Sequence, residues 1–353
     1  MSKQARVAVW LLIVLAGCTT PRRKAESGRA PDWESPDLPK PVQPAPPPPA
    51  RTPPPRLVEP EPTETWISLD HWSRLNGFGP PARISLFPLK CVLTTAGGLL
   101  SAEAGSRTAR WNGSAIHLGF TPRVAGGGLL VHALDVRKNF IPLLDAAPAL
   151  AGTDRVIVLD PGHGGGNTGA KSVFNGADEK ELTLDWAKRL QPLLEARGWI
   201  VFLTRANDVE VPLTERVAFG EQHRADLFVS LHFNSSFPRQ EEAGLETYCL
   251  TPVGMPSNLT RGYDDDPVQD FPNNAFDAQN LQYALRLHRA LLQVNGHQDR
   301  GVRRARFLGV LRGQNRPAVL LEAGYLSNPR EARQIADPGY RQALAEAVAR
   351  ALE

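Results

Sequence analysis

Two histidines and two glutamates in the C-terminal half have the residue types of a hydrolytic metal site. The four are His163, Glu179, His232 and Glu322. Imidazole nitrogens and carboxylate oxygens are ligands of Zn²⁺, and two imidazoles with one carboxylate leave a fourth position open for water. A further glutamate can take the proton from that water. Each residue alone has an ordinary alternative as a loop histidine, a core histidine or a solvated carboxylate, so the prediction depends on bringing the four together.

Buried strands are expected to bring these residues to one edge of a sheet. Three mostly apolar runs, typical of strands buried on both faces, each lead to one of the residues. The runs are Val156–Leu159 before His163, Asp226–Leu231 before His232 and Pro317–Leu321 before Glu322. Glu179 opens an amphipathic helix that ends at Gly198. The carboxyl ends of parallel strands share one edge, where ligands bind, so residues far apart in sequence converge there.

Helices alternate with these strands, which predicts an α/β domain over residues 152–353. A further strand is expected at Trp199–Leu203, and helices are expected at Leu213–His223, at Asp277–Val294 and after a cap at Asn328. This order of elements is typical of a mainly parallel sheet flanked by helices.

The glycines after the first strand also match a dinucleotide-binding fingerprint. Residues 164–169 read Gly-Gly-Gly-Asn-Thr-Gly, which satisfies G-x-G-x-x-G. That fingerprint needs its helix to begin within the glycines, whereas helical periodicity here starts near Glu179. We therefore favour the metal site at this position.

Several segments of this region, taken together, resemble a known family of wall enzymes. The segments are Ile157–His163 through Ala170, Glu179-Lys180 with Leu184 and Ala187, Leu203–Arg205, Leu213–Arg216, Ala225–Asn234 and Pro317–Asn328. They are similar, in this order over about Arg155–Leu352, to the zinc-dependent N-acetylmuramoyl-L-alanine amidases of the Amidase_3 type. The resemblance implies one Zn²⁺ held by His163, Glu179 and His232, with Glu322 as the catalytic acid/base. It also implies peptidoglycan as the substrate, cut between the lactyl group of N-acetylmuramic acid and L-Ala.

Two further residues and two rival functions stay open. Glu181 is an auxiliary candidate for the base, and Asn234 is a candidate for substrate binding because it follows His232 closely. One rival function is a peptidoglycan-binding module that has lost catalysis, which the complete set of four residues disfavours. The other is a zinc peptidase or deacetylase acting on another wall bond. We expect a monomer, and the sequence names no activating protein partner.

The first 17 residues are typical of an export signal. Two basic residues precede an apolar run from Val7 to Leu15, which is too short to cross a bilayer. The tetrapeptide Leu15–Cys18 resembles a bacterial lipobox, in which Cys18 receives lipid and becomes the first mature residue. A plain secretory signal with an incidental cysteine is the alternative. Thr19 resembles the outer-membrane sorting pattern, so we expect a lipid-anchored, periplasm-facing protein of the cell envelope, at the outer membrane.

Residues 18–64 are expected to form a Pro-rich, disordered tether. Of the 32 prolines, 15 lie between Pro21 and Glu64, and almost no aliphatic residue accompanies them. Such a segment cannot bury a core and favours extended polyproline-like conformations.

The whole chain has 40 Lys and Arg against 37 Asp and Glu, so no basic excess points to nucleic acid. Three cysteines exclude a disulfide scaffold and a four-cysteine zinc module.

Residues 65–151 are expected to form a small β-rich domain. Its short strand candidates are Ile84–Leu86, Val92–Leu93, Arg110–Trp111, Ile116–Leu118 and Leu129–Val131. Asn112-Gly113 between two of them is a hairpin signal. The stretch Ala104–Gly113 resembles a small module at the N-terminus of some copper amine oxidases.

Cys91 could pair with Cys249 in an oxidising compartment, or both could be buried thiols.

The segment Val253–Asn274 departs from the family pattern. In some Gram-negative relatives the corresponding region carries a helix that covers the zinc until a partner displaces it. Here Pro256, Pro267 and Pro272 prevent a long helix, and the acidic run Asp264–Asp266 is expected to stay solvated. We therefore expect a mobile wall of the substrate groove rather than a plug.

Overall fold

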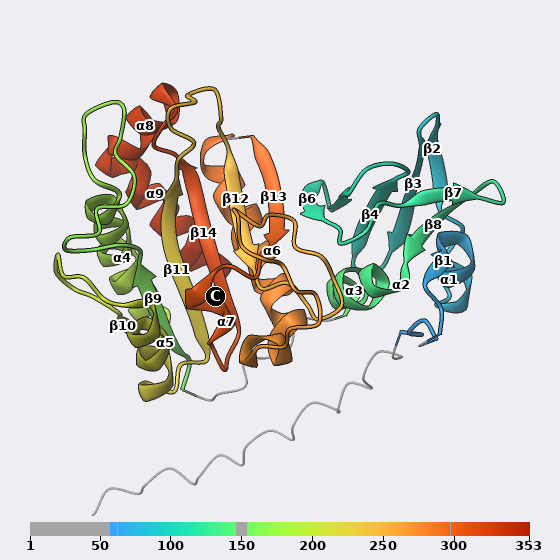
Figure 1. Cartoon of the computed structure of the whole chain (residues 1–353), viewed down its shortest axis with the longest axis horizontal. Coiled ribbons are helices and arrows are strands. Elements are labelled where there is room, and N and C mark those ends of the chain that lie inside the picture. The colour runs from blue at the N-terminus through green and yellow to red at the C-terminus, as the bar shows by residue number, and fades with distance from the viewer. Residues whose placement is uncertain (1–56, 62, 146–153, 297) are drawn as a thin grey trace, which may run out of the picture. The chain divides into compact units, whose positions relative to one another are not determined.

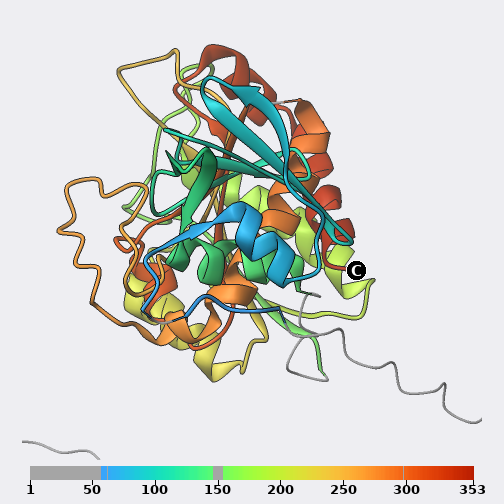
Figure 2. The ribbon, with the colours of Figure 1, turned by 90° about the vertical axis from the view of Figure 1, so that its right-hand side faces the viewer.

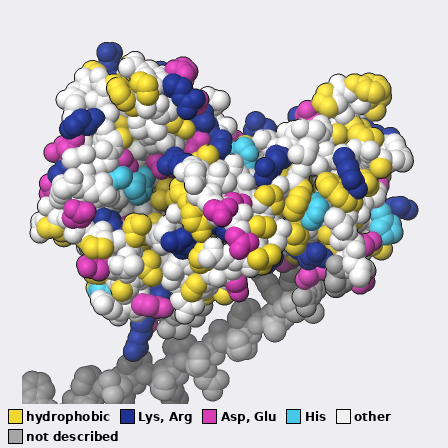
Figure 3. All heavy atoms as spheres, in the orientation of Figure 1, with side chains coloured by type: hydrophobic (Ala, Val, Ile, Leu, Met, Phe, Trp, Pro, Cys, Tyr) yellow, Lys and Arg dark blue, Asp and Glu magenta, His cyan; other side chains and the backbone are white. Residues whose placement is uncertain are grey.

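A computed structural model describes residues 57–61, 63–145, 154–296 and 298–353. The predicted signal, Cys18 and most of the predicted tether lie outside these residues. Within the described ranges, no helix has the length and apolar character needed to cross a membrane. On the face shown in Figure 3, basic and acidic side chains are interspersed rather than gathered into one large field.

The C-terminal region is built on a mainly parallel sheet (Figure 1). Strands β10 (Ile200–Leu203), β9 (Val156–Pro161), β11 (Leu227–Asn234) and β14 (Ala318–Tyr325) lie side by side in that order, all parallel. Strand β12 (Leu245–Cys249) then pairs antiparallel with β14, and β13 (Asp299–Arg304) pairs parallel with β12. The predicted α/β class is confirmed, with β12 and β13 as additions.

Helices cover both faces of this sheet. They are α4 (Glu179–Glu195), α5 (Leu213–Gln222), α6 (Asp277–Asn295), α7 (Gly309–Arg312), α8 (Pro329–Ala336) and α9 (Pro338–Ala351), with a short 3₁₀ helix at Pro272–Phe276. On one face α9 contacts both α4 and α6, and on the other face α5 contacts α7. The single predicted closing helix is two helices, because Asp337 caps α9 and Pro338 takes its first position.

Strand β9 shows why its continuous apolar run specifies a central strand. Ile157 and Leu159 point into the larger core with Trp186 of α4, whereas Val156 and Val158 point into a separate core on the opposite face. Because successive side chains of a strand point to opposite faces, a strand covered on both sides needs apolar residues throughout.

The N-terminal module contains small antiparallel sheets (Figure 2). Its elements are β1 (Trp66–Ser68), α1 (Leu69–Leu75), β2 (Ala82–Leu86), β3 (Leu89–Thr95), β4 (Gly98–Glu103), β5 (Thr108–Trp111), β6 (Ser114–His117), β7 (Arg123–Ala125), β8 (Gly128–His132) and a helical run of α2 (Ala133–Asp135), a π-helix (Val136–Phe140) and α3 (Ile141–Leu144). Asn112 and Gly113 both have positive φ, 49° and 86°, which confirms the predicted tight hairpin. The first helix, β1, β4, β7 and the helical run were not predicted.

Cys91 and Cys249 are both buried free thiols, so the disulfide alternative is wrong.

Strand β6 of the module pairs with β13, so β2 to β6 and the C-terminal strands form one sheet of eleven strands. The pairing is parallel and narrow, with Ile116 opposite Val302. The backbone N–H of Ala115 also donates to Asp299 Oδ2 at 2.8 Å.

Residues 250–271, which we call the wall segment, form no helix or strand. The predicted segment Val253–Asn274 is therefore a loop as far as residue 271, and its last three residues begin the short 3₁₀ helix Pro272–Phe276. No long helix lies in it, whereas its mobility and its role as a groove wall stay predictions. Asp265, however, is not solvated as predicted: its Oδ1 accepts from Arg306 at 2.8 Å, and Arg306 is fully buried. Arg306 also donates to the carbonyl oxygens of Pro252 and Met255. These contacts tie the wall segment to the domain.

Candidate metal centre and catalytic site

The sheet edge brings the four predicted residues to one place. His163 lies two residues beyond the end of β9, His232 lies near the end of β11, and Glu179 is the first residue of α4. On β14, Glu322 is the register partner of His232. His163 adopts a left-handed backbone with φ 64°, which turns the chain sharply after the strand.

Three of these side chains form a compact ligand cluster. One ligand atom from each of His163, Glu179 and His232 lies within 4.8 Å of the others. Glu179 stands between the imidazoles: Oε2 is 3.1 Å from His163 Nε2, and Oε1 is 2.9 Å from His232 Nδ1. Among the described residues, this is the one group of three or more His, Cys, Asp or Glu side chains arranged this way.

Neighbouring groups fix the orientation of the cluster. Asn167 Oδ1 lies 2.9 Å from His163 Nδ1, which leaves Nε2 directed at the cluster. The carboxylate of Glu179 also accepts backbone N–H groups, from Phe233 at 3.1 Å and from Ala170 at 3.0 Å. Outer contacts of this kind set the ring orientation of a ligating histidine.

The electrostatics of the cluster favour an anionic Glu179. Burial alone would raise the pKa of this carboxyl, but the hydrogen bonds from His163 and His232 outweigh burial and hold the pKa well below its usual range. Burial would lower the pKa of His163, yet the hydrogen bond and charge of Glu179 raise it above its ordinary value.

Two glycines leave the space that the cluster needs. A Cβ on Gly162 would lie 2.2 Å from His232 Cε1. A Cβ on Gly169 would lie 2.7 Å from both the Glu179 carboxylate and the His163 ring, and Gly169 also has φ +67°. Larger residues at these two positions would displace the ligands.

Beneath the cluster lies a buried polar network that sequence reasoning missed. Asp160, on β9, accepts hydrogen bonds from Thr204 at 2.6 Å, from Ser230 at 2.7 Å and from Arg216 at 2.6 Å. Arg216 also donates to the backbone carbonyl of His163 at 2.6 Å. The network fixes the strand end that carries His163. The sequence signal that could have revealed this network is Asp160 itself, a charged residue at the end of an apolar strand.

Glu322 has a different environment from Glu179. Its side chain is buried, and Oε2 has no hydrogen-bond partner. Burial raises the pKa of Glu322 well above its usual value, and the charges of Glu179 and Glu246 add to that effect, while Arg261 opposes it. Such a carboxyl is suited to exchanging a proton with a substrate, because burial keeps its pKa high and no donor occupies Oε2.

The residues fit a zinc ion. Two imidazoles and one carboxylate are a ligand set of catalytic zinc sites, which keep a further position open. The unpartnered oxygen of Glu322 lies beside the cluster without belonging to it, which is the arrangement expected of a group acting on water or substrate.

Residues 157–353 match the model of the Amidase_3 family, N-acetylmuramoyl-L-alanine amidase. This chain belongs to the Amidase_3 family. It is 30% identical to the N-acetylmuramoyl-L-alanine amidase AmiC of Escherichia coli O6:H1 over 61% of this chain and 56% of the relative. Against the amidase AmiC of Neisseria meningitidis serogroup B the identity is 34%, over 55% of this chain and 51% of the relative. The chain thus spans about half the length of these two curated relatives.

A solved structure of the amidase AmiC2 of Nostoc punctiforme shares 30% of its sequence with this chain, covering 57% of this chain and 97% of that one, with a TM-score of 0.47.

Glu181 and Asn234, the two further candidates in this Amidase_3 chain, differ in burial and in their contacts. Glu181 is exposed on α4 and is not part of the ligand cluster. Asn234 is buried, and its Nδ2 donates to Glu246 Oε2 at 3.0 Å. Glu246 was not predicted, because it lies on β12, which the sequence did not reveal.

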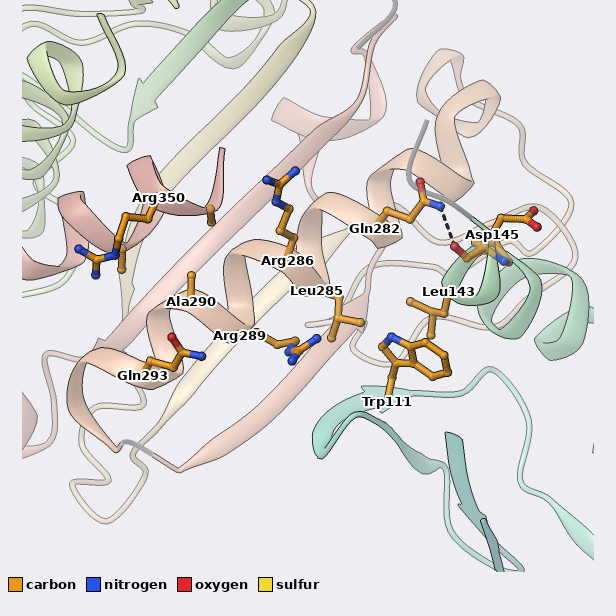
Figure 4. Close-up of a pocket in the computed structure, with 13 residues that line it drawn as sticks. Trp111, Leu143, Asp145, Gln282, Leu285, Arg286, Arg289, Ala290, Gln293 and Arg350 are labelled. Carbon is orange, nitrogen blue, oxygen red and sulfur yellow. Dashed lines mark hydrogen bonds between the residues drawn. The ribbon is translucent and has the colours of Figure 1, made fainter. Parts of the chain in front are cut away.

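A cavity of about 210 Å³ opens beside His163 and His232, two of the three predicted zinc ligands. His163, His232, Asn167, Glu210 and Val310 are among the residues that line it. A larger cavity of about 490 Å³ lies elsewhere, with Trp111, Leu143 and Leu285 gathered along it (Figure 4). Its lining includes none of the four catalytic candidates, so we place the chemistry at the smaller cavity.

Proposed function

We propose that this protein hydrolyses peptidoglycan, cutting the amide between the lactyl group of N-acetylmuramic acid and the L-Ala of the stem peptide. The observation that carries the proposal is the cluster of His163, Glu179 and His232 with the buried carboxyl of Glu322 beside it. Membership of the Amidase_3 family supports the choice of bond.

The division of roles follows from the two carboxyl environments. A zinc ion held by His163, Glu179 and His232 would activate a water molecule and polarise the amide carbonyl. Glu322 accepts a proton from the attacking water and then donates it to the departing amine of L-Ala. Asp160 and Arg216 hold the backbone that carries His163.

Product analysis of a peptidoglycan digest tests this function. We expect muramyl glycan without peptide, together with free peptides that begin with L-Ala, and both should disappear when a chelator removes the metal. Peptides cut at another bond would indicate a zinc peptidase, and released acetate would indicate a deacetylase. Binding without any product would indicate a peptidoglycan-binding module.

We further propose that the chain is a lipoprotein of the cell envelope that faces the periplasm from the outer membrane. The tetrapeptide Leu15–Cys18 and the Pro-rich segment that follows it support this localisation. Metabolic labelling with a fatty acid should mark the wild-type protein but not Cys18→Ser, and the variant should leave the membrane fraction. Equal labelling of both proteins would contradict the assignment.

A further inference from the structure

Arg261 lies on the wall segment, on the same side of the domain as the catalytic glutamate. The Asp265–Arg306 pair and the hydrogen bonds of Asp265 to Ser257 hold this part of the segment in place. Arg261 has a left-handed backbone with φ 46°, and Gly262 follows with φ 77°. Left-handed backbone is uncommon for a residue with a side chain, so the segment imposes a defined turn at Arg261.

The guanidinium of Arg261 reaches the catalytic strands. Its Nη2 is 3.4 Å from Asn234 Oδ1, and its Cζ lies 5.5 Å from the centre of the Phe307 ring. Asn234 is two residues beyond the zinc ligand His232, and its backbone is paired with Tyr325 of β14. Arg261 therefore extends from the wall segment to the edge that carries His232 and Glu322.

The charge of Arg261 lacks a carboxylate partner. Two other arginines of this region are paired with carboxylates: Arg306 with Asp265, and Arg300 with Glu242 and Glu246. In the described part of the chain, no carboxylate oxygen lies within 4.0 Å of the Arg261 guanidinium, and the residue is exposed. A planar guanidinium with free donors matches a carboxylate in geometry and charge.

We propose that Arg261 is a specificity-determining residue that binds a free carboxylate of the stem peptide, on the amine side of the scissile amide. The side follows from Glu322: the group that donates a proton to the leaving amine must lie next to it, and Arg261 lies on the Glu322 side of the ligand cluster. In the stem peptide, the acidic residue after L-Ala carries such a carboxylate unless it is amidated. This inference rests on the proposed function.

A pair of substrates that differ only in this charge tests the proposal. Soluble muramoyl peptides carry either the carboxylate or the carboxamide on the residue after L-Ala. With the zinc-loaded full chain, Arg261→Met should lower kcat/KM about 10- to 100-fold on the carboxylate substrate, mainly through KM, and less than about threefold on the carboxamide. Arg261→Lys should recover part of the loss. Equal losses on the two substrates, or no loss, would overturn the proposal.

Arg312→Met is the matched control. Arg312 also packs against the wall segment, with its guanidinium over the rings of Tyr263 and Phe271. If Arg261→Met acted by loosening the segment, both variants would lose activity without regard to substrate charge. We expect Arg312→Met to treat the two substrates alike.

Binding to the zinc-loaded Glu322→Gln variant separates this inference from the proposed function, because it needs no turnover. Calorimetry should show about tenfold or more preference for the carboxylate ligand, and the added Arg261→Met change should abolish the preference. If the wild type cleaves neither substrate but this preference is found, the proposed reaction fails while the Arg261 site stands. Equal affinity of Glu322→Gln for both ligands would overturn the Arg261 site.

Discussion

Two buried glutamates at the candidate metal centre differ in their hydrogen bonds and charges, and these differences support different proposed roles for them. Glu179 accepts from two imidazoles and two backbone N–H groups, which stabilise the ionised form. Glu322 is buried with one oxygen unpartnered, which favours the neutral form. Pairs of titratable groups whose surroundings push their pKa values apart are typical of acid/base sites. These environments support the proposed roles, with Glu179 as the metal ligand and Glu322 as the group that exchanges the proton.

Substitution of Glu322 should separate metal binding from turnover. Glu322→Gln keeps the shape of the side chain but cannot accept a proton, so we expect one zinc per chain and at least a hundredfold loss of kcat. His163→Ala should lose the zinc itself. Metal analysis and a peptide-release assay on the same samples check both. Normal turnover in Glu322→Gln would reassign the base.

The sequence predicts the proposed metal ligands and the proposed acid/base, but it does not predict several residues that surround them. His163, His232 and Glu322 follow buried apolar runs, so the strand pattern alone places them at one edge. Arg261 and Glu246 lie in stretches without periodicity, and only three-dimensional contacts bring them near Asn234. A single sequence carries no local signal for such contacts.

At the scale of elements, the turn after β9 has to leave room for the ligands. Gly169→Ala should lower zinc affinity at least tenfold, because its Cβ would meet Glu179 and His163 at 2.7 Å. Gly176→Ala is the control: Gly176 has a similar φ, +74°, but its Cβ would meet nothing within 4 Å. Both variants carry the backbone cost of about 1 kcal/mol, so only the steric effect differs. Equal zinc affinities in a competitive titration would contradict the prediction.

Strands β12 and β13 were not predicted, because charged residues interrupt the apolar pattern that is typical of a buried strand. β13 has the sequence Asp-Arg-Gly-Val-Arg-Arg, yet its charged residues find partners inside the fold. Asp299 pairs with His288, and Arg300 pairs with Glu246 of β12. Buried charges are tolerated when they are paired and hydrogen-bonded. Pairing of this kind is a tertiary property that hydrophobic pattern cannot reveal.

The wall segment should depend on Asp265. Asp265→Asn removes the charge that compensates the buried Arg306, so we expect a loss of about 2–4 kcal/mol in the free energy of unfolding at pH 7. Asp264→Asn is the control. Asp264 is exposed, and its substitution should change stability by less than about 0.5 kcal/mol. Urea unfolding measures both, and equal effects would show that the pair does not anchor the segment.

The same substitution has a defined pH dependence. Burial raises the pKa of Asp265, but hydrogen bonds from Ser257 and Arg306 outweigh it and hold the pKa below its usual value of 3.8. A carboxyl with a lowered pKa stabilises the fold above its unfolded pKa and loses that contribution as the pH falls through its folded pKa. The difference between wild type and Asp265→Asn should therefore persist above about pH 4 and shrink below it. A constant difference down to pH 3 would contradict this.

At the scale of the whole molecule, the pairing of β6 with β13 joins the strands of the N-terminal module to those of the catalytic domain in one eleven-stranded sheet. Asp299 sits at the pairing of β6 with β13: Oδ2 accepts the N–H of Ala115 at 2.8 Å, and Oδ1 lies 3.0 Å from Nε2 of the fully buried His288. One carboxylate thus contacts a strand of the N-terminal module and a helix of the catalytic domain.

Because β6 and β13 share a single register pair, removing this carboxylate should weaken the coupling between the two regions. Asp299→Ala leaves the Ala115 N–H and the His288 ring without their acceptor, which costs about 1–3 kcal/mol. We expect calorimetry to show one unfolding transition for the wild type and two for Asp299→Ala. Asp299→Asn retains an acceptor and should restore most of the coupling.

Arg110→Met is the control, since Arg110 contacts Asp299 at 3.4 Å from a half-exposed position and contributes at most about 1 kcal/mol. If Asp299→Ala shifts the transition no more than Arg110→Met, the module and the catalytic domain are coupled by other contacts.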